Sequence, residues 1–215
     1  MEFERLILAA GPTGGKVLRA SDGKKPQSVS FIQCVGSRDV NKNEYCSGFC
    51  CMYALKNAIL LKEKYRDNIE VYIFYIDMRT NFKGYEEFYR RARELGVNFI
   101  RGKVSQVAEN PETKNLLIRS EDMMLGEPIE IESELVVLST AAIPSKGSDE
   151  ISRILSITRG SDGFFMESHP KLKPLDTSVD GIFLAGACQG PKDIPYSVSQ
   201  GSGAAARAAT VLSQP

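Results

Sequence analysis

The stretch Asp180-Gly-Ile-Phe-Leu-Ala-Gly-Ala-Cys-Gln189 has the composition of a short buried strand that runs into a glycine turn. It is followed by Gly190-Pro-Lys-Asp-Ile-Pro195 and by a helical pattern rich in small residues over 197–209. A helix whose first turn lacks large side chains lets a flat ligand approach its backbone N–H groups, and its dipole favours negative charge there. The tail therefore predicts a ligand site, and the alternative is a plain strand, turn and packed helix.

Apolar runs bounded by turn residues recur along the rest of the chain, and helical patterns lie between them. Strands are predicted at 6–10, 29–35, 71–76, 97–100, 116–119, 135–140 and 181–185, and helices at 51–64, 85–95, 150–155 and 197–212. Polar alternation in the strands is weak, which predicts that most are buried on both faces. Strands that alternate with helices predict a parallel sheet and an α/β fold.

Two stretches with loop composition, 11–27 and 144–147, follow strands that end in small residues. We expect them to be crossovers between two domains. The segment 28–133 would then be one unit of strand, helix, strand, helix and a hairpin, while both flanks belong to another sheet.

Composition places the chain among ordinary globular proteins. It has 215 residues, of which 42% are hydrophobic and 25% charged, and Lys+Arg equals Asp+Glu at 27 each, so no charge excess indicates nucleic-acid binding. No apolar run approaches the roughly 20 residues of a membrane-spanning helix. The first residues lack the order of a signal peptide, so we expect a cytoplasmic protein with reduced cysteines.

Four of the five cysteines are Cys34, at the end of a predicted strand, and Cys46, Cys50 and Cys51, around the start of the next helix. Four thiolates are the usual ligands of a [4Fe–4S] cluster, and a helix N-terminus favours the thiolate form. Structural zinc, a thiol redox pair and inert buried cysteines are the alternatives. Adjacent Cys50 and Cys51 strain the ligation of one zinc ion, and the spacing is not that of a Cys-x-x-Cys pair.

The tail resembles the closing motif of thioredoxin-reductase-type flavoproteins, in which a strand ending Ala-Gly-Asp is followed, after a fixed spacer, by a helix containing Ala-Gly-x-Gly. Leu6-Ile-Leu-Ala-Ala-Gly11 resembles the family's Ala-Thr-Gly strand, and Leu135-Val-Val-Leu-Ser-Thr140 resembles its second crossover. The resemblance implies a Rossmann-type, NAD(P)-domain-like unit at 28–133. This unit is inserted in a partial FAD-binding domain formed by 1–27 and 134–215.

The same resemblance implies which residues contact FAD. They are Gly11, Pro12, Gly186, Ala187, Cys188, Gln189, Ile194, Tyr196, Ser197 and Gly201. Ala187 stands where the family has Asp, so the acceptor for the ribityl chain would come from the backbone or from Gln189. Pro195 has no N–H, so Tyr196 and Ser197 would present amides to the flavin. The chain has no pyrophosphate motif and supplies only half of an FAD site, and no catalytic side chain is predicted.

Lys83 belongs to Asp77-Met-Arg-Thr-Asn-Phe-Lys-Gly-Tyr-Glu86, which follows a predicted strand. Open α/β sheets bind ligands at this end of a strand, and a cation beside a flavin tunes its potential, so Lys83 is a candidate flavin contact. A solvated loop is the alternative.

Ser28-Val-Ser-Phe-Ile-Gln-Cys-Val-Gly-Ser-Arg38 lies where the related reductases begin their NADPH domain, but only Gly36 remains of a G-x-G-x-x-G motif. We therefore predict no tight binding of nicotinamide cofactors.

Phe31-Ile-Gln-Cys-Val-Gly-Ser-Arg-Asp39, Tyr45-Cys-Ser-Gly-Phe-Cys-Cys-Met-Tyr-Ala54 and Gly186-Ala-Cys-Gln-Gly-Pro-Lys-Asp-Ile-Pro195 together resemble the A subunits of heterodisulfide reductases. That family implies FAD and a [4Fe–4S] cluster, flavin-based electron bifurcation in methanogenesis, and electron delivery to a CoM-S-S-CoB-like disulfide. The implied partners are the remainder of the A subunit, with its FAD half and ferredoxin domains, other subunits of the complex, and a second copy. The isolated chain is expected to be inactive. A flavin-dependent disulfide reductase with a cysteine pair and a non-catalytic scaffold are the alternatives.

Overall fold

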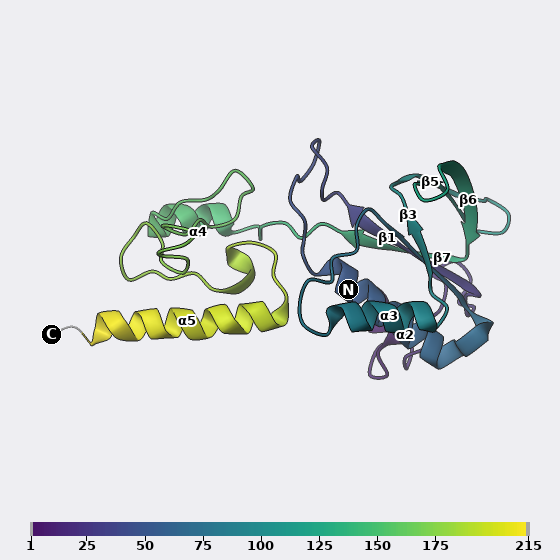
Figure 1. Ribbon diagram of the computed structural model, residues 1–215, viewed down its shortest axis with the longest axis horizontal. Coiled ribbons are helices and arrows are strands. Elements are labelled where there is room, and N and C mark those ends of the chain that lie inside the picture. Colours follow the sequence, from purple (N-terminus) through teal and green to yellow (C-terminus); the bar gives the residue numbers. More distant parts are fainter. Residues whose placement is uncertain (1, 214–215) are drawn as a thin grey trace. The chain divides into compact units, whose positions relative to one another are not determined.

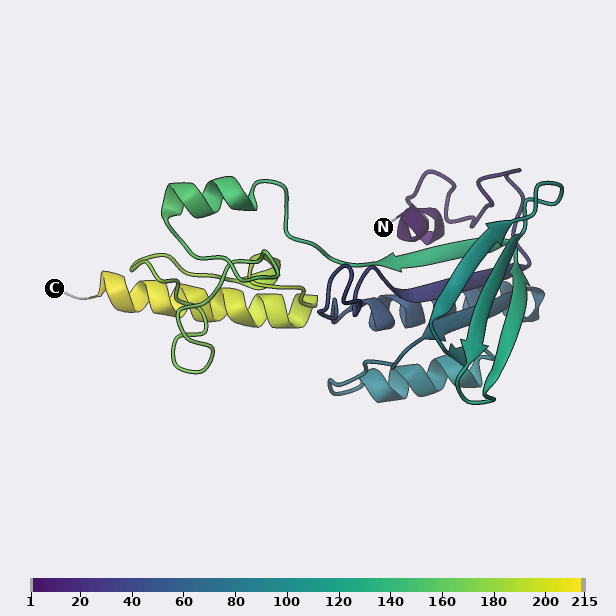
Figure 2. The ribbon, with the colours of Figure 1, turned by 90° about the horizontal axis from the view of Figure 1, so that it is seen from above.

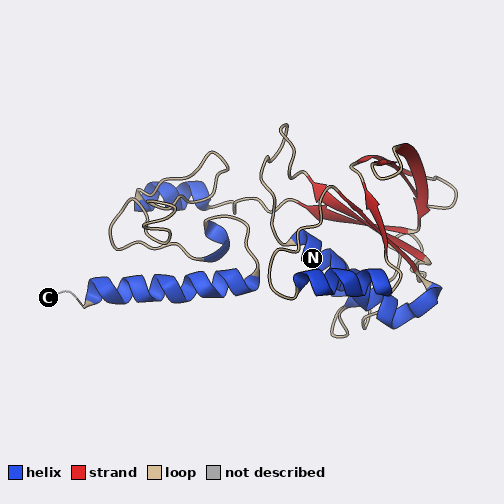
Figure 3. Ribbon diagram, viewed as in Figure 1, coloured by secondary structure: helices blue, strands red, loops and turns tan. Residues whose placement is uncertain are grey.

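The computed structural model describes residues 2–213, which form two compact units. The first unit comprises the residues up to Val35 together with Cys50–Thr140, and the second comprises Gly36–Phe49 together with the residues from Ala141 on. All strands named for the described residues lie in the first unit, whereas the second is built from helices and irregular segments (Figure 3).

The first unit is a sequence of short helices and strands. Its elements are α1 (Glu2–Ile7), β1 (Ser28–Val35), α2 (Cys50–Tyr65), the 3₁₀ turn η1 (Arg66–Asn68), β2 (Glu70–Tyr75), α3 (Tyr85–Glu94), β3 (Asn98–Arg101), β4 (Val104–Glu109), β5 (Leu116–Asp122), β6 (Glu127–Ser133) and β7 (Leu135–Thr140). In the second unit, α4 (Ser148–Leu155) and the long helix α5 (Ile194–Leu212) are joined by an irregular segment that contains the 3₁₀ turn η2 (Gly186–Cys188) (Figure 2).

A parallel sheet with strand order β3-β2-β1-β7 forms the centre of the first unit, and an antiparallel sheet with order β4-β5-β6 accompanies it. Strand β1 pairs with β2 on one side and with β7 on the other, both in parallel. Figure 1 shows α2 and α3 on one side of the parallel strands and β5 and β6 on the other. Strand β1 is therefore hydrogen-bonded at both edges and covered on both faces.

Alternate residues of β1 fill two separate cores, as expected for a pleated strand. Phe31 packs with Leu55 of α2 and Ile73 of β2 in the core beneath the helices. Ile32 packs with Phe74 and Ile118 in the core beneath the antiparallel sheet. This two-sided burial explains the nearly continuous apolar run from which the strand was predicted.

The structure confirms the α/β class, the parallel sheet and all four predicted helices. The strand predicted at 116–119 is confirmed and forms part of the longer β5. Strands β4 and β6 were not predicted individually, but only as part of a hairpin without stated bounds. Residues 135–140 were predicted to belong to another sheet. This prediction is wrong, because they form β7, which pairs with β1 from Val29 opposite Leu135 to Val35 opposite Thr140. Residues 2–27 and 135–140 also group with the first unit rather than with the tail.

Two predicted strands are absent among the described residues. Segment 6–10 lies at the end of α1, whose Phe3 packs edge to face on Phe31 with ring centroids 5.3 Å apart. Segment 181–185 forms only the isolated antiparallel bridge of Asp176 with Phe183. A buried strand needs neighbours for its backbone groups, and neither segment has a parallel neighbour in the described chain, so the apolar runs adopt other conformations.

A matched pair on α2 tests the core of the first unit. Leu61 is fully buried, whereas Leu60 is 38% exposed. We expect Leu61→Ala to lower the free energy of unfolding by about 2–5 kcal/mol because it leaves a cavity, and Leu60→Ala to lower it by less than about 1 kcal/mol. Urea denaturation followed by circular dichroism measures both, and equal losses would contradict this core.

Candidate functional site

The tail turn, defined here as residues 186–197, holds most of the predicted flavin contacts. Asp193 caps α5, because its side chain accepts a hydrogen bond of 2.9 Å from the Tyr196 N–H. Pro195 lies in the first turn of the helix, where its missing N–H costs nothing, as predicted. The predicted amides are already used in this structure, since the Ser197 N–H donates to the Asp193 carbonyl oxygen at 3.1 Å. The capping residue, and not a ligand, therefore satisfies these two amides.

Buried amide groups hold the glycine turn against α5. Gly186 has a φ of +74°, a conformation that favours glycine, and its N–H donates to Gln200 Oε1 at 2.8 Å. Gln200 Nε2 donates to Gln189 Oε1 at 2.6 Å. Gln189 Nε2 in turn donates to Glu167 Oε2 at 2.8 Å and to the Pro174 carbonyl oxygen at 3.0 Å. The Gln189 amide, predicted as an acceptor for ribityl, is thus committed to the turn itself.

Sequence reasoning missed Gln200 and Glu167, which hold this turn. The only available signal for Gln200 was one long polar side chain within a helix of small residues. Its role appears only once the helix packs on the turn, where it is 9% exposed.

The first turns of α5 are partly exposed within the second unit. Ile194 is 80% exposed and Tyr196 49% exposed. A Cβ at Gly201 would meet no described atom within 4 Å, whereas one at Gly203 would lie 2.6 Å from Leu175 Cδ1. The helix therefore packs closely at Gly203 and is open at Gly201 within the described chain. Ala187 and Cys188 are also exposed.

A cation lies at the tail turn. Burial lowers the pKa of Lys192, and electrostatic interaction with Cys188 and Glu167 acts in the opposite direction. The turn therefore carries a half-buried amine that the sequence analysis did not single out.

The other predicted flavin contacts belong to the first unit. Gly11 lies in the turn after α1, where a side chain would collide with the Arg5 carbonyl oxygen. Pro12 follows it in the same turn, and Lys83 lies in the exposed loop before α3. The tail turn belongs to the second unit, so neither unit by itself carries all the predicted contacts.

The cysteine turn, defined here as Cys34 together with residues 46–51, follows the central strand. Strand β1 ends in a bulge, because Ile32 pairs with Leu138 while Val35 pairs with Thr140. Cys34 lies in this bulge with a φ of +59°, a conformation that costs a residue other than glycine about 1–3 kcal/mol. Bulges redirect side chains near functional sites. The backbone is therefore strained at a predicted ligand.

The other cysteines of the turn differ in their surroundings. Cys50 and Cys51 open α2 and are 2% and 3% exposed, and Cys51 Sγ lies 3.9 Å from the Asp77 carbonyl oxygen. Cys46 is half-buried and its Sγ accepts a hydrogen bond of 3.3 Å from the Gly48 N–H. Helix α2 begins at Cys50, so Cys46 lies in the loop before the helix and does not share a helical face with Cys50.

The four cysteines are divided between the units. Cys34, Cys50 and Cys51 belong to the first unit and Cys46 to the second. Over residues 2–213, no group of three or more His, Cys, Asp or Glu side chains is arranged to hold a metal ion. The structure thus shows where each thiol lies in its own unit and does not show an assembled metal centre.

The pKa of Tyr53 indicates which groups surround its side chain near the start of α2. The pKa of Tyr53 is raised to about 12, first because the phenol is buried; the nearby Ser139 hydroxyl lowers it, and electrostatic interaction with Cys50 and Cys51 raises it further. The phenol therefore lies near the two thiols of α2 and near β7. This corner of the unit is largely shielded from solvent.

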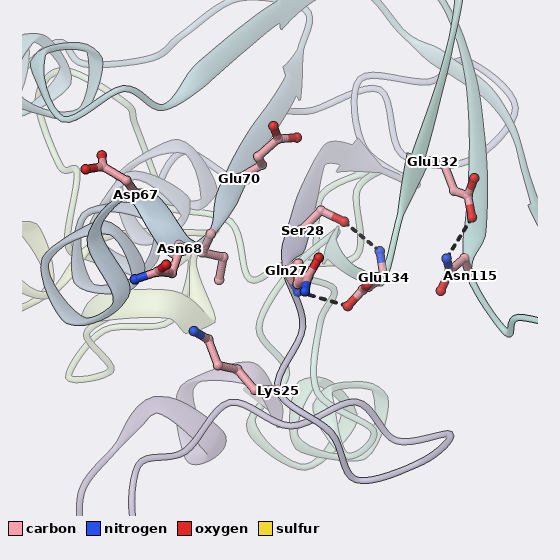
Figure 4. Close-up of a pocket in the computed structure, with 10 residues that line it drawn as sticks. Lys25, Gln27, Ser28, Asp67, Asn68, Glu70, Asn115, Glu132 and Glu134 are labelled. Atoms are coloured by element: carbon pink, nitrogen blue, oxygen red, sulfur yellow. Dashed lines mark hydrogen bonds between the residues drawn. The ribbon is translucent and has the colours of Figure 1, made fainter.

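A surface pocket lies at the opposite, amino-terminal end of the parallel strands (Figure 4). Ser28 and Glu70 begin β1 and β2, and Glu134 accepts a hydrogen bond of 2.9 Å from the Gln27 N–H. Ligands of open α/β sheets bind at the carboxyl ends of strands, which is the end of β1 that carries Cys34. The pocket therefore does not mark the functional end of the sheet.

The chain is similar over nearly its whole length to known proteins. No protein-family model matches the chain. It is 60% identical over 214 residues to a CoB–CoM heterodisulfide reductase iron-sulfur A subunit of Methanopyrus kandleri, and this covers 99% of the chain and 32% of that protein. Over its length, the chain matches one part of the A subunits of heterodisulfide reductases. The A subunit of Methanocaldococcus jannaschii is 53% identical over 216 residues, and the chain again spans only 33% of it.

Solved structures show the same fold. Thioredoxin reductase of T. acidophilum aligns with a TM-score of 0.57 and 17% identity, over 89% of this chain and 54% of that one. Thioredoxin reductase of Lactococcus lactis aligns with a TM-score of 0.55 and 20% identity, over 86% and 52%. The predicted thioredoxin-reductase-like fold is confirmed. No helix among residues 2–213 is long and apolar enough to cross a membrane.

Removing the Gln200 amide should loosen the tail turn. We expect Gln200→Leu to lower the free energy of unfolding of the second unit by about 1–3 kcal/mol, because the buried Gly186 N–H loses its acceptor. Ser199→Ala, an exposed neighbour on the same helix, should change it by less than about 0.5 kcal/mol. Amide hydrogen exchange at Gly186 is the direct measurement. Unchanged protection in Gln200→Leu would show that the hydrogen bond is unimportant.

Proposed function

We propose that this chain is part of a flavin and iron–sulfur electron-transfer protein, in which it closes an FAD site and ligates one [4Fe–4S] cluster. The cysteine turn carries the proposal. In a nucleotide-binding unit of this fold, the first strand leads through a glycine loop to a helix whose N-terminus receives the pyrophosphate. Here β1 leads to Cys34, and α2 begins with two buried cysteines. This arrangement favours electron transfer over hydride transfer.

The residues at the turn suit a cluster on chemical grounds. Four thiols are the ligand set that such clusters require, and Cys34 is held in a strained backbone conformation. The neighbouring Gln33 is 6% exposed, and neither polar atom of its side chain has a hydrogen-bond partner among the described residues. A buried amide without a partner is what a bound group with sulfur acceptors would satisfy. The proposed ligands are Cys34, Cys46, Cys50 and Cys51.

For the flavin, the tail turn and α5 supply one side of the site. A bound FAD would provide a two-electron carrier that can release electrons singly. The chain's own contribution is to hold the Gly186 turn through Gln200 and Gln189 and to place Lys192 beside it. The sequence has no G-x-G-x-x-G motif, so the pyrophosphate must be held by residues outside this stretch.

The relatives suggest the larger setting. One relative, from Methanothermobacter thermautotrophicus, is named as the A subunit of an H(2):CoB-CoM heterodisulfide,ferredoxin reductase and is 51% identical over 211 residues, but the chain spans only 32% of it. We therefore propose that the chain works with the remainder of such an A subunit, with the other subunits of a complex, and as a dimer in the cytoplasm. The proposed reaction is reduction of a CoM-S-S-CoB-like disulfide, coupled to flavin-based bifurcation.

Iron and acid-labile sulfide content tests the cluster. We expect the anaerobically prepared chain, produced with cluster-assembly machinery, to contain about four iron and four sulfide per chain. Replacing Cys34, Cys46, Cys50 or Cys51 singly by Ser should remove most of both. Cys188→Ser is the matched control, because Cys188 lies outside the cysteine turn, and it should retain full content. A wild-type chain without iron and sulfide would contradict the proposal.

Nicotinamide binding separates this function from a flavin-dependent disulfide reductase. With an N-terminal FAD-binding segment supplied, we expect NADPH and NADH to bind more weakly than about 1 mM and not to reduce the flavin. Stopped-flow absorbance measures the reduction and calorimetry the binding. NADPH-driven reduction that alkylation abolishes, without loss of metal, would support the disulfide reductase. Neither flavin nor metal in the combined protein would support a scaffold.

A further inference from the structure

Gln33 is an unusual residue for a buried strand, and it lies near the carboxyl end of β1. Its side chain is 6% exposed, and both its amide nitrogen and its amide oxygen have no hydrogen-bond partner in the described chain. Burying an amide without a partner is unfavourable, because the group loses its hydrogen bonds to water. Native structures leave few such groups, and each calls for an explanation. An apolar residue at this position would avoid the cost, so the amide indicates a partner that the protein atoms do not supply.

The pleat of β1 indicates where this amide lies. Val29 and Phe31 pack with Ala54 and Leu55 of α2, whereas Ile32 packs beneath the antiparallel sheet. Gln33 continues the row of Val29 and Phe31 by one step towards the carboxyl end of the strand. Because β1 and β2 are parallel and α2 connects them, the end of β1 meets the start of α2. That start is Cys50 and Cys51.

The neighbouring strand gives an independent indication. In the bulge, Gln33 and Cys34 together lie opposite Ser139 of β7. Ser139 is 1% exposed, and its hydroxyl also has no hydrogen-bond partner in the described chain. Ser139, Cys50 and Cys51 all influence the pKa of the Tyr53 phenol, so they lie near it. Gln33, Ser139 and the first turn of α2 therefore border the same buried corner, and Cys34 is the next residue of the chain.

We propose that the Gln33 carboxamide donates a hydrogen bond to a sulfur of the cluster at the cysteine turn, and that this bond raises the reduction potential of the cluster. The inference rests on the proposed function. One-electron reduction adds negative charge to the cluster, and a donor to sulfur stabilises that charge. Hydrogen bonds to sulfur and burial are among the factors that set such potentials. The low dielectric of the corner strengthens the bond. Gln33 thus contacts the cluster and tunes it but does not ligate it.

Gln33→Met tests this inference, because methionine has a similar length and no donor. We expect the variant to keep wild-type iron and sulfide, and its equilibrium constant for one-electron reduction to fall about tenfold, which is about 59 mV towards lower potential. A redox titration of the anaerobic chain, followed by electron paramagnetic resonance, measures the potential.

Ser30→Ala is the matched control. Ser30 is also buried on β1 without a partner for its hydroxyl in the described chain, but it lies in the row of Ile32, away from α2, and should change the constant by less than about twofold.

A second variant covers the case in which Gln33→Met does not retain the cluster. Gln33→Glu keeps the shape of the side chain and, when ionised, only accepts hydrogen bonds, so its potential should also fall. Unchanged potentials in loaded variants would overturn the inference while leaving the cluster intact. Folded variants that both lack iron would also overturn it, because the amide would then serve cluster retention. A wild-type chain without iron would instead refute the proposed function.

Discussion

The structure of the first unit depends on the two-sided burial of β1. This strand is hydrogen-bonded to β2 and β7 and is covered by helices on one face and by the antiparallel sheet on the other. Such a strand has no freedom to shift its register, because a slip by one residue would exchange Phe31 and Ile32 between the two cores. The position of its carboxyl end, where Cys34 lies, is therefore fixed by packing over the whole unit.

That fixed end explains how one fold can serve different chemistry. A glycine loop after the strand would leave room for a pyrophosphate at the helix N-terminus. In this chain, β1 instead ends in the bulge at Cys34, and α2 begins with the buried Cys50 and Cys51. The end of the strand and the start of the helix carry thiols in this chain. The Cys34 backbone is strained, and the pairing and packing of the surrounding sheet hold it in this conformation.

The tail turn is held by a different kind of interaction. Directional hydrogen bonds from Gln200 and Gln189 fix the Gly186 turn, and Asp193 fixes the start of α5. The buried apolar cluster of the second unit is small, and within the described chain it consists of Ile157, Phe165 and Leu184. With so small a core, polar contacts decide the local geometry of the turn. Its exposed apolar residues, such as Ile194 and Val198, are consistent with a site completed by other parts of a larger protein.

The sequence by itself determined the α/β class, the helices and the clustering of cysteines, because apolar periodicity and residue spacing are local properties. It did not determine that segments 6–10 and 181–185 lack parallel neighbours among the described residues, since strand formation depends on distant partners. Only the tertiary structure placed Gln200 on the Gly186 N–H and left Gln33 buried without a partner in the described chain. Hydrogen-bond satisfaction is a property of the packed chain, because it depends on which groups folding brings together and which it removes from water.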